Sequence, residues 1–228
     1  MAIADASNTF PARLLVVADR DYVGDDERWL ALLAEVAASA TTCAEMGRPV
    51  AIQVRAKSAS RVEAAALASR ARDVVPRNVI LLLNGDTALA ERLGYAGVHW
   101  PEADVPATRP PHAIAFRSAA AHSPAAAQRA RAAGADVAVF GAVYAPGSHP
   151  GEGLGLDALR EVAQQTGLPV IAIGGIQPEH VADCIEAGAA GVAVVSGILG
   201  APNIEHAVSR YLEAIEEAIN ARMERARS

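Results

Sequence analysis

The feature that most constrains the fold is a regular alternation of two kinds of segment along the chain. Short apolar segments, typical of buried β-strands, alternate with longer Ala-rich segments that have a helical period. Eight strand segments are expected at residues 14–18, 50–54, 79–83, 97–99, 113–116, 136–140, 170–173 and 191–195. Helical segments are expected at residues 26–46, 60–73, 87–93, 124–133, 157–166, 178–187 and 203–221.

Strict alternation of strands and helices predicts a parallel sheet with right-handed crossovers. Eight units favour a closed barrel over an open doubly wound sheet, and 228 residues suit one such domain. The predicted fold class is therefore α/β, a single (β/α)₈ TIM barrel. We expect residues 1–12 to form a flexible tail and residues 13–228 to form the barrel with its C-terminal helix. Residues 100–111 have no helical period, so an irregular loop is expected in place of the fourth helix.

The overall composition argues against nucleic acids and membranes as binding partners of the protein. The net charge is −6 and the basic residues are scattered, which argues against a nucleic-acid surface. No apolar run approaches the ~20 residues that span a bilayer, and the first dozen residues lack the features of a signal peptide. Cys43 and Cys184 match no metal or redox spacing and are expected to be buried. These features predict a cytoplasmic protein.

Glycine-bearing turns follow the last two predicted strands. Gly174 and Gly175 come directly after the seventh strand, and Val195, Ser196 and Gly197 come at the end of the eighth. Glycine lets main-chain N–H groups approach phosphate oxygens closely, and the second turn leads into a short helix whose N-terminus favours an anion. The alternative is that the glycines only make tight turns. Two such turns on neighbouring strands favour phosphate binding by these five residues.

Polar residues also stand at the ends of the second and third predicted strands. The period of a strand puts Gln53, Arg55 and Lys57 on one face, where burial would be costly unless they met a ligand or each other. The alternative is an exposed strand end. Asn84 follows the third strand and could bind substrate, whereas Asp86 is expected to cap the next helix. We therefore interpret Gln53, Arg55, Lys57 and Asn84 as candidate substrate-binding residues.

His122 lies in the turn after the fifth predicted strand. Histidine is the side chain best suited to move protons near neutral pH, although a single loop histidine is more often incidental. His99 ends the fourth strand, where the alternative role is to fill the rim of the barrel.

Several short motifs occur in an order typical of a known family. They are Gln53-x-Arg55-x-Lys57, Asn84 with Ala88-Leu89-Ala90, Gly97-Val98-His99, Gly134-Ala135-Asp136, Phe140-Gly141-x-Val143-Tyr144, Gly153-Leu154-Gly155, and the segments 171–176 and 188–198. With this set, residues from about 14 to 199 resemble the thiamine phosphate synthase superfamily, which includes the thiazole tautomerases. The resemblance implies a role in thiamine biosynthesis and a thiazole phosphate as the small ligand.

Departures from the synthase pattern bear on the choice of reaction. Synthases of this family join a pyrimidine pyrophosphate to the thiazole phosphate and need Mg²⁺. One metal ligand would be an aspartate directly after the strand-three asparagine, where this chain has Gly85; the second would be Asp104. A single carboxylate makes a poor Mg²⁺ site. Residues 145–151 also lack the threonines and the lysine of the loop that grips pyrophosphate in synthases.

The resemblance to tautomerases implies that His122 acts as general base and then general acid in converting a thiazole carboxylate phosphate to its aromatic tautomer, with no cofactor. This isomerase reaction is the favoured hypothesis. The alternatives are a Mg²⁺-dependent synthase, in which Asp104 would hold the metal, and a non-catalytic binder of a phosphorylated ligand. The final helix is expected to pack on the barrel or on a second copy in a homo-oligomer.

Overall fold

The computed structural model describes residues 10–145 and 152–227, and these form a closed barrel of eight parallel strands. Each strand pairs with the next along the chain, and β1 pairs with β8 to close the ring. The strands are β1 (Leu14–Asp19), β2 (Val50–Arg55), β3 (Ile80–Asn84), β4 (Gly97–Trp100), β5 (Phe116–Ala121), β6 (Val137–Gly141), β7 (Val170–Ile173) and β8 (Gly191–Val194). The predicted TIM barrel is confirmed.

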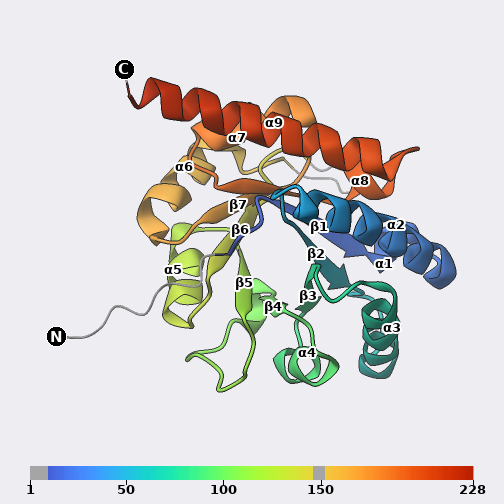
Figure 1. Ribbon diagram of the computed structural model, residues 1–228. Helices are drawn as coiled ribbons and strands as arrows, with labels where there is room; N and C mark the ends of the chain where they lie inside the picture. The colour runs from blue at the N-terminus through green and yellow to red at the C-terminus, as the bar shows by residue number, and fades with distance from the viewer. Residues whose placement is uncertain (1–9, 146–151, 228) are drawn as a thin grey trace.

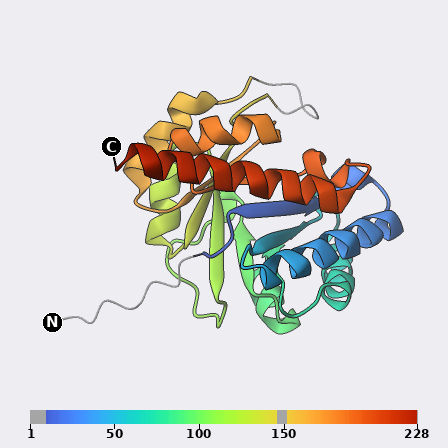
Figure 2. The same ribbon diagram turned by 45° about the horizontal axis from the view of Figure 1, so that its top comes forward.

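Helices surround the barrel (Figure 1). They are α1 (Arg20–Val23), α2 (Asp26–Glu45), α3 (Arg61–Val74), α4 (Thr87–Leu93), α5 (Pro124–Ala132), α6 (Gly155–Thr166), α7 (Val181–Glu186), α8 (Ser196–Leu199) and α9 (Ile204–Arg225), with 3₁₀ turns η1 (Glu102–Asp104) and η2 (Pro178–His180). The long α9 crosses one side of the molecule and packs against α2 and α7 (Figures 1 and 2). The final helix therefore lies on the barrel itself.

Capping side chains fix the starts of several helices close to where the sequence predicts them. The Asp86 carboxylate accepts a hydrogen bond from the Leu89 N–H at 2.9 Å, which confirms its role as the cap of α4. Ser123 caps α5 through the Ala126 N–H at 3.2 Å, and Pro124 occupies the first helical position. These caps fix where the turns after β3 and β5 end and the next helices begin.

Alternation along the strands separates two apolar layers. Leu14 and Val16 of β1 face the helices, whereas Leu15 and Val17 face the barrel interior. The interior is filled by short and branched side chains, among them Ala51, Leu82, Val137, Ile171 and Ala193. Phe10 joins this interior cluster and meets Phe116 edge-on, with ring centroids 5.7 Å apart. The barrel is thus a packed core, closed by Phe10 at the N-terminal end of the strands.

Residues 10–12 belong to the expected N-terminal tail but do not behave as one. Phe10 and Ala12 are buried, because Phe10 contributes to the barrel interior. The remaining tail, residues 1–9, lies outside the described residues.

The fifth strand departs from the prediction. Residues 113–116 were expected to form it, but β5 runs from Phe116 to Ala121 and shares only Phe116 with that segment. The strand contains buried Arg117 and Ser118, which the apolar pattern does not favour. Hydrogen bonds to other segments compensate part of this burial. One guanidinium nitrogen of Arg117 donates to the carbonyl of His112 at 2.8 Å, while its Nε and other terminal nitrogen have no partner among the described residues. The Ser118 hydroxyl contacts the ring of His99 at 2.9 Å.

The segment between β4 and β5 is irregular, as predicted. It contains only the 3₁₀ turn η1, and no α-helix covers this side between the two strands. Tertiary contacts hold its ends: the Trp100 indole N–H donates to the Thr87 hydroxyl at 3.0 Å, and Glu91 accepts hydrogen bonds from the His112 ring and the Ala113 N–H.

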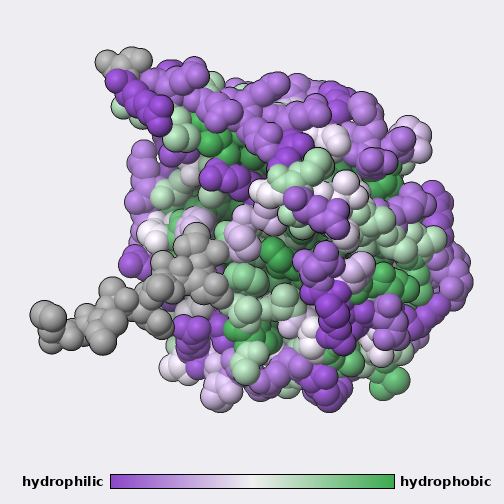
Figure 3. All heavy atoms as spheres, in the orientation of Figure 1, coloured by the Kyte–Doolittle hydropathy of each residue, from purple (hydrophilic) through white to green (hydrophobic). Residues whose placement is uncertain are grey.

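The surface view shows hydrophilic residues over the outer side of α9, with hydrophobic side chains visible nearer the centre of the face (Figure 3). Among the described residues, no helix has both the length and the apolar character needed to cross a bilayer.

Candidate active site

Polar side chains replace the apolar filling toward the C-terminal ends of β1 to β4 and in the middle of β5. Asp19 pairs in register with Arg55, Asn84 with His99, and His99 with Ser118. By the alternation of each strand, these five residues share the interior face with the filling below them. We call Asp19, Arg55, Asn84, His99 and Ser118, together with Gln53, the polar layer.

The candidate substrate residues of β2 and β3 meet one another in this layer. The Gln53 side-chain amide donates to the side-chain oxygen Oδ1 of Asn84 at 3.1 Å. The Arg55 guanidinium forms an ion pair with the carboxylate of Asp19. Gln53 is buried and Arg55 is partly exposed, so the Arg55 guanidinium is the more accessible of the two to a ligand. Lys57 instead lies in the exposed turn after β2, beyond the polar layer.

His99 is buried within the polar layer and bonded to Ser118. Burial, with the nearby positive charge of Arg55 as a second cause, lowers the pKa of His99 to about 4. Its ring is therefore neutral at physiological pH. This agrees with a role in filling the rim rather than in proton transfer.

His122 lies in the turn between β5 and α5, and its ring is held by Glu102. The Nδ1 atom of His122 is 2.7 Å from Oε2 of Glu102, and the main-chain N–H of His122 donates to the same oxygen at 2.9 Å. Arg129 donates to the other carboxylate oxygen at 3.1 Å. Burial raises the pKa of Glu102, but the hydrogen bonds from His122 and the charges of His122 and Arg129 lower it by more, so Glu102 is ionised at neutral pH.

A cavity of about 320 Å³ lies between the turns that follow β7 and β8. Gly174, Gly175, Val195 and Ser196 line it, and Ala145 closes one side. Gly174 and Gly175 have φ values of +102° and +62°, and a Cβ atom on Gly174 would lie 2.4 Å from Cα of Ala142. Glycine is therefore required here by backbone conformation and by close packing.

Two main-chain N–H groups of the cavity lining, those of Gly175 and Ser196, donate no hydrogen bond to a described residue. The N–H of Gly197, which follows Ser196 in the chain, also has no acceptor among the described residues. Gly175 is partly buried and Ser196 is exposed, so both N–H groups are accessible from solvent. Free donors from two turns, converging on one cavity, suit an anion with several oxygens.

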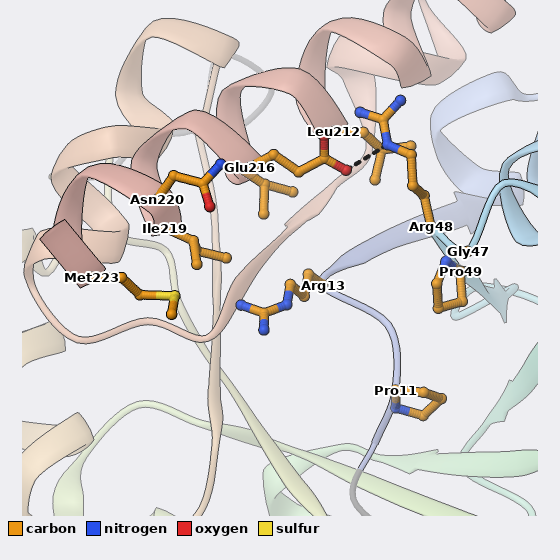
Figure 4. Close-up of a pocket in the computed structure, with 11 residues that line it drawn as sticks. Pro11, Arg13, Gly47, Arg48, Pro49, Leu212, Glu216, Ile219, Asn220 and Met223 are labelled. Atoms are coloured by element: carbon orange, nitrogen blue, oxygen red, sulfur yellow. Dashed lines mark hydrogen bonds and ion pairs between the residues drawn. The ribbon is translucent and has the colours of Figure 1, made fainter.

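A second cavity, of about 350 Å³, lies at the opposite end of the barrel (Figure 4). Pro11, Arg13 and the loop 47–49 line one side, and residues of α9 line the other. The Arg48 side chain is paired with Glu216 of α9 at 2.5 Å. Active sites of such barrels are built at the C-terminal ends of the strands, so this cavity lies on the wrong side for catalysis.

The family is decided by comparison with known proteins. A model described as thiamine monophosphate synthase matches residues 15–198. The chain belongs to the thiamine monophosphate synthase family. It is thus an enzyme of a family that acts in thiamine biosynthesis and binds phosphorylated precursors of thiamine.

Curated relatives carry the name of the synthase. The chain is 40% identical over 174 residues to a thiamine-phosphate synthase of Thioalkalivibrio sulfidiphilus, covering 73% of this chain and 81% of that protein. It is 35% identical over 173 residues to that of Natronomonas pharaonis, covering 72% and 81%. A bifunctional ThiM/ThiE protein of Symbiobacterium thermophilum is 38% identical over 157 residues, covering 66% of this chain but only 33% of that longer protein.

A solved structure supports the fold. Thiamine phosphate pyrophosphorylase from Pyrococcus furiosus matches with a TM-score of 0.71 and 22% identity, over 91% of this chain and 97% of that one.

The residues of this chain do not fit the Mg²⁺ site expected of a synthase. Gly85 has no side chain, and the carboxylate of Asp86 is occupied by its cap to α4 and by Arg61, 3.8 Å away. Asp104 is exposed on η1. Within residues 10–145 and 152–227, no three His, Cys, Asp or Glu side chains lie close enough to hold a metal ion. Of the segment expected to replace the pyrophosphate-gripping loop, residues 146–151 lie outside the described residues.

Two residues of the site were missed by sequence analysis. Asp19 could have been found, because the period of β1 puts it on the same face as Leu15 and Val17, next to Arg55. Glu102 offered no such signal. It stands in an irregular loop, and only tertiary structure brings it to His122.

Proposed function

We propose that the chain binds a thiazole phosphate at the barrel mouth and catalyses a proton shift that converts a thiazole carboxylate phosphate to its aromatic tautomer. The observation that carries this proposal is the state of His122, whose ring is held through Nδ1 by an ionised carboxylate. A histidine fixed in this way has its other nitrogen free to exchange a proton with a ligand.

The phosphate would occupy the cavity between the β7 and β8 turns. The N–H groups of Gly175 and Ser196, which line the cavity, would donate to its oxygens, together with the N–H of Gly197 directly after Ser196; none of the three donates to another described residue. Val195 and Gly174 would shape the walls. Anchoring one end of the ligand in this way orients the thiazole ring toward the polar layer.

The ring and its carboxylate would then lie near Arg55, Asn84 and His122. Arg55 supplies positive charge for a carboxylate, and Asn84 supplies an amide that can donate or accept. Nε2 of His122 takes a proton from one ring position and returns it to another. No proton is gained or lost overall, and the reaction needs no second substrate and no metal.

The second candidate is the coupling of a pyrimidine pyrophosphate to the thiazole phosphate. It is favoured by the names of the relatives, which are thiamine-phosphate synthases at 35–40% identity. Against it stand Gly85 in place of the metal-ligating aspartate and an Asp104 that belongs to no group of three or more potential metal ligands among the described residues.

One pair of assays separates these reactions. The purified chain is given the non-aromatic thiazole carboxylate phosphate, and aromatic product is followed by ultraviolet absorbance with either MgCl₂ or EDTA. We expect equal turnover in both. The same chain is given pyrimidine pyrophosphate, thiazole phosphate and MgCl₂, and we expect no thiamine phosphate by chromatography.

Formation of thiamine phosphate would overturn the proposal in favour of the synthase. Tight binding of thiazole phosphate without turnover in either assay would favour a non-catalytic binder instead.

A further inference from the structure

Glu102 makes three contacts that converge on the turn bearing His122. One of its carboxylate oxygens contacts both the ring Nδ1 and the main-chain N–H of His122, at 2.7 and 2.9 Å. The other oxygen accepts from Arg129 at 3.1 Å. Glu102 comes from the 3₁₀ turn after β4, whereas His122 and Arg129 come from the turn and helix after β5. The contact therefore joins two separate strand-end loops.

We propose that Glu102 is a positioning residue that selects the proton-accepting tautomer of His122. This inference rests on the proposed function of the site.

The tautomer follows from hydrogen-bond chemistry. An ionised carboxylate can only accept, so the nitrogen facing it must carry the proton. Because Nδ1 faces Glu102, the neutral ring of His122 carries its proton there and keeps the lone pair on Nε2. A free histidine side chain prefers the opposite tautomer, with the proton on Nε2, and in that form Nε2 cannot accept a proton.

Glu102 also contributes after the proton has moved. When Nε2 accepts a proton from the ligand, the ring becomes positively charged. The carboxylate 2.7 Å from Nδ1 then stabilises that charge, and Arg129 keeps the carboxylate in place. The same group thus prepares the base and stabilises the acid that returns the proton.

The ion pairs of Glu102 contribute little to the stability of the folded protein. The side chains of His122 and Arg129 are 61% and 59% exposed, and ion pairs at such exposure contribute little to stability. An effect of Glu102 on turnover would therefore not be explained by loss of folded protein.

The test combines a spectroscopic readout with kinetics on the full chain. In ¹⁵N-labelled protein, long-range ¹H–¹⁵N correlations report which ring nitrogen of His122 carries the proton, and His122→Asn assigns the signals. The variants are Glu102→Ala, Glu102→Gln and the control Glu186→Gln. Glu186 is an exposed carboxylate paired with Arg225 on the α7–α9 side, away from the site.

We expect Glu102→Ala to shift His122 from the Nδ1–H to the Nε2–H tautomer in the ligand-free protein. We also expect kcat to fall on the order of 100-fold, the lower end of what a positioned acid or base contributes, with KM nearly unchanged. Glu102→Gln keeps an oxygen acceptor and should fall between Glu102→Ala and the parent in both readouts. Glu186→Gln should match the parent in both.

An unchanged His122 tautomer in Glu102→Ala would overturn the inference, as would a changed tautomer with unchanged kcat. The tautomer readout needs no substrate. If the parent chain fails to turn over the thiazole carboxylate phosphate, the proposed function is lost, but the tautomer still decides whether Glu102 positions His122.

Discussion

The two halves of the barrel mouth expose different chemical groups, main-chain N–H groups in one half and charged or polar side chains in the other. The half after β7 and β8 presents main-chain N–H groups around a cavity, and its lining residues carry no charged side chain. The half formed by β1 to β5 presents charged and polar side chains, with Arg55 paired to Asp19 and His122 to Glu102. One half recognises through the backbone and the other through side chains.

This difference separates binding from chemistry. A main-chain anion site depends on backbone conformation and tolerates few changes at its glycines. A site made of side chains can be altered by single substitutions, because each side chain supplies its own charge or hydrogen-bonding group. The comparison therefore predicts that ligand class is preserved within the family while the reaction varies.

The largest effect should come from His122→Asn on the side-chain half. Removal of the acid/base group should lower kcat on the order of 1,000-fold, whereas the Kd for thiazole phosphate should stay nearly unchanged. Turnover assays and calorimetry measure the two quantities. His206→Asn, a change at an exposed histidine of α9, is the matched control. Equal loss of binding and turnover would contradict the separation of the two halves.

The next effect concerns His99 and the way the free energy of unfolding of the protein depends on pH. Because its pKa in the folded protein is about 4, below the ordinary 6.5, the unfolded chain binds more protons between these values. Its contribution to stability is complete above about pH 6.5 and is lost as the pH falls toward 4, by roughly 3 kcal/mol. Urea unfolding of the parent and of His99→Asn at several pH values measures it. Parallel pH profiles for the two proteins would contradict this account.

A smaller effect, on ligand affinity instead of turnover, should come from Gly175→Ala on the main-chain half. The left-handed φ of +62° makes a side chain costly by about 1–2 kcal/mol, and the new Cβ would lie 2.7 Å from the Ala145 carbonyl oxygen. We expect phosphate affinity to fall about 10-fold or more, measured by calorimetry. Gly47→Ala shares a positive φ but has open space around it at the other end of the barrel, and should leave affinity unchanged. Full affinity in Gly175→Ala would remove the phosphate site from this turn.

The smallest effect is expected at the far end of the barrel. Arg48→Gln breaks the pair with Glu216 beside the second cavity, and should cost about 1 kcal/mol or less in unfolding free energy. Kinetic constants should not change. A clear loss of turnover would mean that the two ends of the barrel are coupled, which the present comparison does not predict.

Patterns of neighbouring residues in the sequence predicted the features that depend mainly on short-range interactions, namely the order of the strands and the glycine turns. The order of strands follows from alternating apolar segments, and the glycine turns follow from backbone conformations that other residues resist. Gln53, Arg55 and Asn84 were expected on one face or at one strand end, and the structure brings them together.

Features that depend on tertiary partners were missed or misplaced. The fifth strand was expected over the apolar residues 113–116, because Arg117 and Ser118 look unsuited to burial until His112 and His99 are seen beside them. Glu102 was missed for the same reason. Its role depends on the distance to His122, which no spacing in the sequence encodes.

Among the described residues, Phe10 closes the N-terminal end of the barrel interior. Its ring packs edge-on against Phe116, and apolar side chains fill the interior between this pair and the mouth. Whatever is made at the mouth must leave by the route that brought its precursor. Product and substrate should therefore compete for the same opening and the same phosphate site. The reaction should slow as product accumulates, because both molecules keep the phosphate group that binds there.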